Sequence, residues 1–208
     1  MTVTRVAIAG SSGSIGTQTI EVIRAEPDRY QVTALAVGSS ADLVIEQAQE
    51  LRPELVVVTD ESQRERVASA LPGVQVTGTL SDVVEVADVV INGVVGFAGL
   101  SVTLETLRAG RTLGLANKES LIAAGPIVQP LRATPGAQLI PVDSEHCAIH
   151  QCLRSSYATD TEVARLVLTA SGGPFRGRSA ASLASVTVDE ALAHPTWKMG
   201  PKITIDSS

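Results

Sequence analysis

Residues 6–16 read VAIAGSSGSIG, and this stretch decides the fold class of the chain. The apolar run 6–9 has the length of a buried strand, and it ends at the first of three glycines spaced G-x-x-G-x-x-G. The amphipathic stretch 15–25 then predicts a helix. A strand, a glycine turn and a helix in this order offer backbone N–H groups to a dinucleotide pyrophosphate. A purely structural turn is the alternative for the motif taken alone.

The same alternation of short apolar runs and amphipathic stretches continues along the chain. It predicts an α/β fold, with a Rossmann-like doubly wound parallel sheet. We expect a Rossmann-like NADP-binding domain over residues 1–143, and the incomplete start of an α+β catalytic domain over 144–208. Beyond the first domain, residues 163–169 favour one further strand. The predicted strands are 6–9, 32–37, 55–58, 88–91, 113–115 and 138–142, and the predicted helices are 15–25, 41–51, 62–71 and 102–109.

Composition and charge exclude several classes of protein. The 208 residues are 44% hydrophobic and 18% charged, which is typical of a folded domain with a substantial core. A formal net charge of -6 argues against a nucleic-acid partner, which would require a basic face. No apolar segment has the length of a membrane span, and the first residues do not resemble a signal peptide. With two cysteines and no disulfide framework, we expect a cytoplasmic protein whose Cys147 and Cys152 are reduced.

The end of the second predicted strand indicates which dinucleotide is bound. NAD-specific folds usually place an acidic residue there to hold the ribose 2′-hydroxyl. Here the strand runs into Gly38, Ser39 and Ser40, and no acidic residue appears before Asp42. A carboxylate would repel a 2′-phosphate, whereas hydroxyl and N–H groups would accept it, so the sequence favours NADP. No arginine or lysine stands in this loop to strengthen the preference.

Two polar segments follow predicted strands and therefore lie at the edge of the sheet where ligands bind. Lys118 would place a cation beside the cofactor, although a solvated Lys–Glu pair at a helix start is the alternative. Asp143 and Glu145 would project to the same side of an extended backbone and suit Mg²⁺ or Mn²⁺. Alternatively, Glu145 simply opens a helix. His146 and His150 are spaced like zinc ligands, but the H-E-x-x-H pattern is absent, which argues against zinc.

Two further segments occur in the last quarter of the chain. Residues 169–175 read TASGGPF, and Ser171 with its two following glycines could form a nest of N–H groups for a phosphate. Residues 194–200 read HPTWKMG and contain Trp197, the single tryptophan of the chain. A tryptophan between proline and glycine is typical of a mobile lid over a ligand, and equally of an anchor that holds a loop on the core.

Together these segments closely resemble the 1-deoxy-D-xylulose 5-phosphate reductoisomerase family, whose members depend on NADPH and a divalent metal. The matching stretches occur in the order of the family and span nearly the whole chain. They are GSSGSIG (10–16), LANKESL (115–121), PVDSEH (141–146), TASGGPF (169–175) and HPTWKMGPKITIDS (194–207). The family continues with an N-K-G-L-E stretch and a helical domain, which do not appear before Ser208. We therefore expect an N-terminal portion of such an enzyme.

The resemblance implies a role for each matching position. The expected NADPH contacts are Ser12, Gly13, Ser14, Ile15, Gly38, Ser39, Ser40, Asn117, Glu119 and Gly200. The expected metal ligands are Asp143 and Glu145, and the expected catalytic residues are these two with Lys118. The expected substrate contacts are Lys118, Ser144, Glu145, Ser171, His194, Trp197 and Ser207. A full-length protein of this kind would be a homodimer that binds a small phosphorylated sugar.

The resemblance also implies the reaction. A metal-assisted rearrangement of the sugar skeleton, by retro-aldol cleavage or by a direct shift, precedes hydride reduction to 2-C-methyl-D-erythritol 4-phosphate in the non-mevalonate isoprenoid pathway. One alternative is an inactive fragment that acts at most as a nucleotide-binding module. A different NADP-dependent oxidoreductase, similar to homoserine dehydrogenase, is a further alternative, against which the stretches SGGPF (171–175) and HPTW (194–197) argue.

Overall fold

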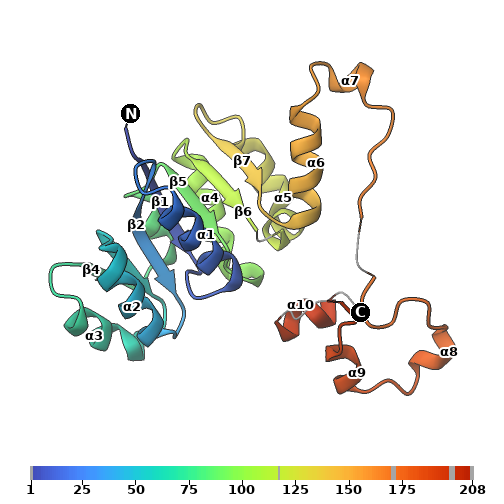
Figure 1. The fold of residues 1–208 in the computed structure, drawn as a ribbon, viewed down its shortest axis with the longest axis horizontal. Helices are drawn as coiled ribbons and strands as arrows, with labels where there is room; N and C mark the ends of the chain where they lie inside the picture. The colour runs from blue at the N-terminus through green and yellow to red at the C-terminus, as the bar shows by residue number, and fades with distance from the viewer. Residues whose placement is uncertain (1, 117, 170–171, 197–199, 207–208) are drawn as a thin grey trace. The chain divides into compact units, whose positions relative to one another are not determined.

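The computed structural model describes residues 2–116, 118–169, 172–196 and 200–206 (Figure 1). The chain divides into two compact units, Met1–Ser155 and Ser156–Ser208. The boundary expected at 143/144, between a cofactor domain and a catalytic domain, stays a prediction. By packing alone, the helix that follows residue 143 belongs to the first unit, because it contacts the last strand of the sheet.

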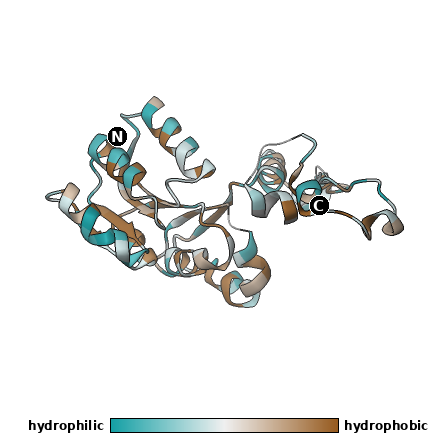
Figure 2. Cartoon of the chain, turned by 90° about the horizontal axis from the view of Figure 1, so that it is seen from below, coloured by the Kyte–Doolittle hydropathy of each residue, from teal (hydrophilic) through white to brown (hydrophobic). Residues whose placement is uncertain are grey.

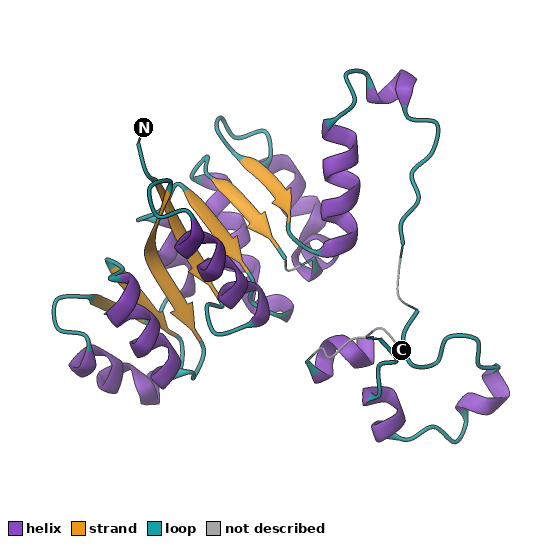
Figure 3. Cartoon of the chain, viewed as in Figure 1, coloured by secondary structure: helices purple, strands orange, loops and turns teal. Residues whose placement is uncertain are grey.

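The first unit contains a seven-stranded parallel sheet in the order β4-β3-β2-β1-β5-β6-β7 (Figure 3). The chain winds outward from β1 through β2 to β4, and then returns to the other side of β1 with β5. The predicted doubly wound sheet is therefore confirmed. The strands are β1 (Thr4–Ala9), β2 (Tyr30–Val37), β3 (Leu55–Val58), β4 (Gln75–Thr77), β5 (Val89–Asn92), β6 (Thr112–Leu115) and β7 (Gln138–Pro141).

Helices cover both faces of this sheet because the strands are apolar on both sides. In β1, Val6 and Ile8 pack on one face with α1, α2 and α3, whereas Ala7 and Ala9 pack on the other with η1 and α4. Leu113 in β6 packs with α4 and α5. Figure 2 shows apolar residues running along the strands. The helices of the first unit are α1 (Ser14–Ala25), α2 (Ala41–Leu51), α3 (Glu61–Ala70), η1 (Leu80–Val84), η2 (Gly96–Gly99), α4 (Leu100–Arg108), α5 (Glu119–Leu131) and α6 (Ser144–Arg154).

Two parts of the structure differ from the strand prediction. The short strand β4 was not predicted, because Gln75–Thr77 carries a single apolar residue and is exposed or half-buried. The strand expected over 163–169 is wrong: this segment is extended but belongs to no sheet, and Leu166, Val167 and Leu168 are each about 60% exposed. An apolar run becomes a strand only when a neighbouring strand pairs with it, and within the described residues none lies beside it.

The second unit contains short helices joined by loops, and no strand occurs among its described residues. A capping box begins α9, in which Thr187 and Glu190 bond reciprocally. Hydrogen bonds from Thr187, and then from Arg178, hold the pKa of the Glu190 carboxyl below its ordinary value. Residues 203–205 lie in a helix, although their apolar-polar alternation is typical of a strand. The helices are α7 (Thr159–Glu162), α8 (Ala180–Leu183), α9 (Val188–Leu192) and α10 (Pro201–Asp206).

Candidate functional site

The candidate site lies at the edge of the sheet where the parallel strands end. The chain changes direction between β1 and β5, so the loops after these two strands diverge to opposite faces. Such a switch point opens a crevice at the carboxyl ends of the strands, and ligands of doubly wound folds bind there. The glycine turn follows β1, and the loops after β2, β5, β6 and β7 share the same edge.

The glycine turn is held rigidly against the end of β2. The backbone N–H groups of Gly10 and Ser11 both donate to the carbonyl of Ala36, at 2.9 and 3.0 Å. Gly10 adopts a φ of +86°, which a residue with a side chain rarely does. A Cβ at Gly16 would overlap the Gly10 carbonyl oxygen and lie 2.5 Å from the Ser11 Cα. The glycine at this position therefore lets α1 approach the turn closely.

The N-terminus of α1 faces the edge of the sheet without a side-chain cap from any described residue. Gly13 precedes the helix in extended conformation, and Gly13 and Ser14 are exposed. Ser12 and Ile15 are half-buried. No acidic residue stands in the first turn. The helix N-terminus, with its partial positive charge, is thus accessible to an anion at the four positions predicted to contact a dinucleotide.

The loop after β5 packs directly against the glycine turn. A Cβ at Gly10 would lie 3.1 Å from the carbonyl carbon of Gly93, and one at Gly93 would lie 3.4 Å from the Cβ of Ile15. Asn92 holds this loop: its Nδ2 donates to the Gly99 carbonyl at 2.8 Å and to Thr103 Oγ1 at 3.0 Å. Its Oδ1 accepts from the N–H of Val94 at 3.3 Å. Asn92 is fully buried, so its amide fixes the loop that follows β5.

Sequence reasoning missed Asn92, although a signal was present. Asn92 ends the otherwise apolar run that forms β5, at the position where a strand enters its ligand-binding edge. A buried amide at such a point has to find partners, and here both of its polar atoms find them within the adjoining loop and helix α4.

We expect Asn92→Ala to lower the free energy of unfolding by about 1–3 kcal/mol, because it leaves buried partners unsatisfied. Urea unfolding followed by circular dichroism measures this change. Thr103→Val is the matched control, since it removes one partner and leaves the other two hydrogen bonds of the amide in place. Equal stability of the two variants would contradict the role given to Asn92.

The loop after β2 is open and lacks an acidic residue at its start. Gly38, Ser39 and Ser40 are exposed, and no atom lies within 4 Å of a Cβ placed on Gly38. The carbonyl of Gly38 accepts from the N–H of Asp60 at 3.2 Å, so the start of α3 borders this loop. The loop is thus open to solvent, and its contact with the adenosine ribose of a dinucleotide stays a prediction.

Lys118 lies at the start of α5, just beyond β6. Its backbone N–H donates to the Ala116 carbonyl at 3.1 Å, and its own carbonyl accepts from Leu121 at 3.0 Å. The Lys118 side chain is exposed, and Glu119 is the first residue of α5. Pro126 and Pro130 lie inside this helix, which is kinked at Ala124. Because β6 pairs with β7, Lys118 follows one strand and the two carboxylates follow its neighbour in the sheet.

The two predicted metal ligands do not share an extended backbone. Asp143 is extended, but α6 begins at Ser144, so Glu145 lies in the first helical turn. The backbone therefore agrees with the alternative prediction, in which Glu145 lies at the start of a helix. Asp143 caps this helix: its Oδ2 accepts from the N–H of His146 at 3.3 Å and lies 2.5 Å from His146 Nδ1. The Asp143 side chain is 13% exposed.

Asp143 and Glu145 lie two residues apart at the first turn of α6, and carboxylate oxygens are the ligands that Mg²⁺ and Mn²⁺ prefer. Asp143 has a second carboxylate oxygen beyond the one that contacts His146. Across the described parts of the chain, no three His, Cys, Asp or Glu residues gather in a way that could hold a metal. Asp143 and Glu145 alone therefore do not complete the coordination shell of a divalent ion.

The remaining predicted site residues belong to the second unit or lie outside the described residues. In the second unit, His194 Nδ1 accepts from the N–H of Thr196 at 3.2 Å, and Gly200 is exposed. The structure does not place either of them relative to the sheet. Their roles stay predictions. Asn117, Ser171, Trp197 and Ser207 lie outside the described residues.

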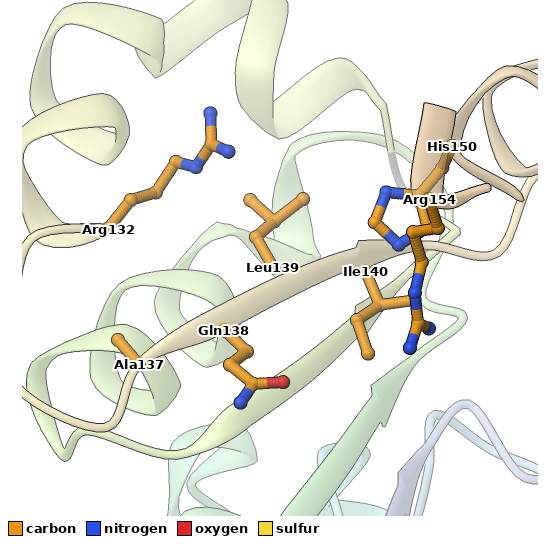
Figure 4. Close-up of a pocket in the computed structure, with 7 residues that line it drawn as sticks. All are labelled: Arg132, Ala137, Gln138, Leu139, Ile140, His150 and Arg154. Atoms are coloured by element: carbon orange, nitrogen blue, oxygen red, sulfur yellow. The ribbon is translucent and has the colours of Figure 1, made fainter. Parts of the chain in front are cut away.

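A hollow lies between β7 and α6, away from the loops of the candidate site (Figure 4). It is lined by Arg132, Ala137, Gln138, Leu139, Ile140, His150 and Arg154. Figure 4 shows the Arg132 side chain on one side of the hollow and those of His150 and Arg154 on the other, with the two guanidinium groups apart. The cationic groups therefore do not converge on one point as they would in an anion-binding site.

Cys147 and Cys152 both lie in α6 as free thiols, as predicted. Among the described helices, none combines the length and the apolar character that a membrane crossing requires.

Family models match both parts of the chain. Residues 6–125 match the model of 1-deoxy-D-xylulose 5-phosphate reductoisomerase, and residues 139–208 match that of its C-terminal domain. Curated reductoisomerases are similar to this chain along nearly its whole length. That of Leifsonia xyli is 52% identical over 208 residues, and that of Thermomicrobium roseum is 48% identical over 208 residues. The matches cover 100% and 98% of this chain, but 52% and 53% of those proteins. The chain thus spans about half the length of these relatives.

Solved structures agree with the sequence comparison. A reductoisomerase from Zymomonas mobilis in complex with NADPH superposes with a TM-score of 0.89 at 37% identity, covering 100% of this chain and 54% of that one. A second reductoisomerase, in complex with NADPH, fosmidomycin and magnesium, superposes with a TM-score of 0.86 at 36% identity. That match covers 99% of this chain and 54% of the other. The resemblance inferred from the sequence motifs is confirmed by these matches.

Proposed function

The chain belongs to the 1-deoxy-D-xylulose 5-phosphate reductoisomerase family, and from this premise we propose that it binds NADPH at the glycine turn and supplies part of the family's reductoisomerase site. The observation that carries the proposal is the geometry of residues 10–16. The turn is pinned to β2, packed against the loop after β5, and followed by a helix N-terminus that no described side chain caps. This arrangement suits a pyrophosphate.

The polar groups at the ends of β6 and β7 support the second half of the proposal. Lys118 supplies a cation that would stabilise negative charge developing on a bound sugar phosphate. Asp143 and Glu145 would hold Mg²⁺ or Mn²⁺, which supplies Lewis-acid polarisation of a substrate carbonyl. Ser144 is exposed beside them and would bind substrate. Asn117, Glu119 and Gly200 would complete the cofactor contacts, and Ser171, His194, Trp197 and Ser207 the substrate contacts.

The proposed overall reaction is the conversion of 1-deoxy-D-xylulose 5-phosphate to 2-C-methyl-D-erythritol 4-phosphate, carried out by the whole enzyme. When bound, NADPH would supply the hydride that reduces the rearranged aldehyde, and the segment around Trp197 would exclude water from it. We propose a cytoplasmic location and a homodimer for the full-length protein. Retro-aldol cleavage and a direct shift both remain compatible with these residues.

A second candidate function is that of a nucleotide-binding module without turnover. One observation favours it for these 208 residues: no three metal-ligating side chains gather among those that the structure describes. Two carboxylates alone hold a divalent ion weakly, because such ions require about six oxygen ligands.

Titration of the purified chain with NADPH, followed by the fluorescence of the reduced nicotinamide, tests the shared part of both candidates. We expect saturable binding that is tighter for NADPH than for NADH. Adding 1-deoxy-D-xylulose 5-phosphate with Mg²⁺ or Mn²⁺ and following absorbance at 340 nm then separates them. We expect little or no oxidation of NADPH by the 208-residue chain. Rapid metal-dependent oxidation would favour the complete enzyme, whereas absence of any binding would refute both candidates.

A further inference from the structure

The loop that would receive the 2′-phosphate of NADPH contains no cation of its own. Gly38, Ser39 and Ser40 provide N–H and hydroxyl groups, and the first charged residue after them is Asp42. Asp42 lies in the first turn of α2, and its side chain is 85% exposed. A carboxylate at that place would repel a dianionic phosphate unless a positive charge accompanied it.

The structure supplies this positive charge from another helix. Arg66 lies on α3, and its Nη2 donates to Asp42 Oδ1. The guanidinium is therefore placed beside the first turn of α2, directly after the open loop. A second contact brings α3 to the same loop, because the N–H of Asp60, which caps α3, donates to the carbonyl of Gly38.

Arg66 remains able to take a second acceptor. Its side chain is 55% exposed, and a guanidinium carries five N–H donors, of which the contact with Asp42 uses the Nη2 group. The competing carboxylate of Asp60 is engaged elsewhere: its Oδ1 accepts from the backbone N–H and the hydroxyl of Ser62, at 3.0 and 2.7 Å. Arginine also matches the geometry of phosphate oxygens better than lysine does.

We propose that Arg66 is a specificity-determining residue that contacts the 2′-phosphate of the dinucleotide, with Asp42 orienting its guanidinium. The inference rests on the proposed function, since it presupposes that a dinucleotide binds at the glycine turn. It explains how the chain can prefer NADPH although the loop after β2 lacks a basic residue. The cation comes from a helix 24 residues further along the chain than Asp42.

The same molecule contains a comparable ion pair that serves as a control. Arg24 on α1 pairs with Glu50 on α2, and both side chains are about half exposed, as Arg66 is. Arg24 and Glu50 lie in the last turns of their helices, whereas Asp42 lies in the first turn of α2. The two pairs thus involve opposite ends of α2. Replacing either arginine removes a contact between two helices, but only Arg66 lies beside the end of α2 that follows the loop after β2.

The test compares Arg66→Gln, Arg66→Lys and the control Arg24→Gln by titration of each purified chain with NADPH, NADH and adenosine 2′,5′-bisphosphate. For Arg66→Gln we expect NADPH and the bisphosphate to bind about tenfold more weakly, as for loss of a charged hydrogen bond, with NADH affinity unchanged. Arg66→Lys should recover part of the loss, and Arg24→Gln should bind all three ligands as the unchanged chain does.

The outcomes separate this inference from the proposed function. If the unchanged chain prefers NADPH and Arg66→Gln keeps the same ratio of NADPH to NADH affinity, the role of Arg66 is refuted and the proposed function stands. If Arg66→Gln lowers the affinity for NADPH and for NADH equally, Arg66 supports the fold and does not contact the 2′-phosphate. If the unchanged chain binds neither dinucleotide, the inference fails together with the proposed function.

Discussion

Replacing Gly16 by alanine will weaken the binding of NADPH more than tenfold and lower the free energy of unfolding by about 1–3 kcal/mol, the usual cost of overpacking. The added methyl group would meet the carbonyl oxygen of Gly10 and the Cα of Ser11. Both contacts are backbone atoms of a turn that is itself hydrogen-bonded to Ala36, so the turn cannot retreat. Helix α1 has to move outward, and its N-terminus leaves the position that suits a pyrophosphate.

Gly125 in α5 offers a matched control for this substitution. It is also a helical glycine, but no atom lies within 4 Å of a Cβ placed on it. Gly125→Ala should therefore bind NADPH normally and unfold at the same or a higher urea concentration, because alanine favours a helix over glycine. Fluorescence titration and urea unfolding measure both quantities. Normal NADPH affinity in Gly16→Ala would show that the approach of α1 to the turn does not shape the cofactor site.

The sequence predicted the sheet well because its strands are buried on both faces. Continuous apolar runs such as 6–9 and Leu55–Val58 identify strands without knowledge of their neighbours. A glycine follows each of the first two strands, β1 and β2. The strand Gln75–Thr77 could not be found in this way, because it lies at the edge of the sheet and is half polar. Conversely, residues 163–169 have the composition of a strand but do not form one. A strand also requires a neighbouring strand to pair with, and composition does not encode that pairing.

The candidate site was predictable where its residues are consecutive, and less so where distant elements meet. The glycine turn carries its own signal, since its spacing and its place after a strand are both visible in the sequence. The contacts of Asn92 with η2 and α4, and of Arg66 with Asp42, join residues 7 to 24 positions apart. Only the packing of the helices brings these groups together. Asp143 and Glu145 were identified, but the start of α6 changed their relative placement.

Replacing Asp143 by asparagine will abolish the binding of a divalent ion at the start of α6 while leaving the helix intact. Asp143 has two roles that this substitution separates. As an N-cap its side chain accepts from His146, and asparagine caps a helix about as well as aspartate does. As a metal ligand it contributes a negative charge that asparagine lacks. Since loss of a group that merely supports a ligand costs about 10–100-fold in metal affinity, loss of the ligand itself should cost more.

The measurement is the binding of Mn²⁺ to the purified chain in the presence of substrate, followed by the electron paramagnetic resonance signal of the free ion. In a full-length protein that carries these residues, we expect Asp143→Asn to abolish metal-dependent turnover while NADPH still binds. Glu145→Gln should weaken Mn²⁺ binding likewise. Asp143→Ala is the contrasting variant, because it removes the cap as well and should also lower the stability of α6 by about 1 kcal/mol. Undiminished turnover in Asp143→Asn would refute the metal role and leave Asp143 as a helix cap, so the metal site would have to be sought elsewhere.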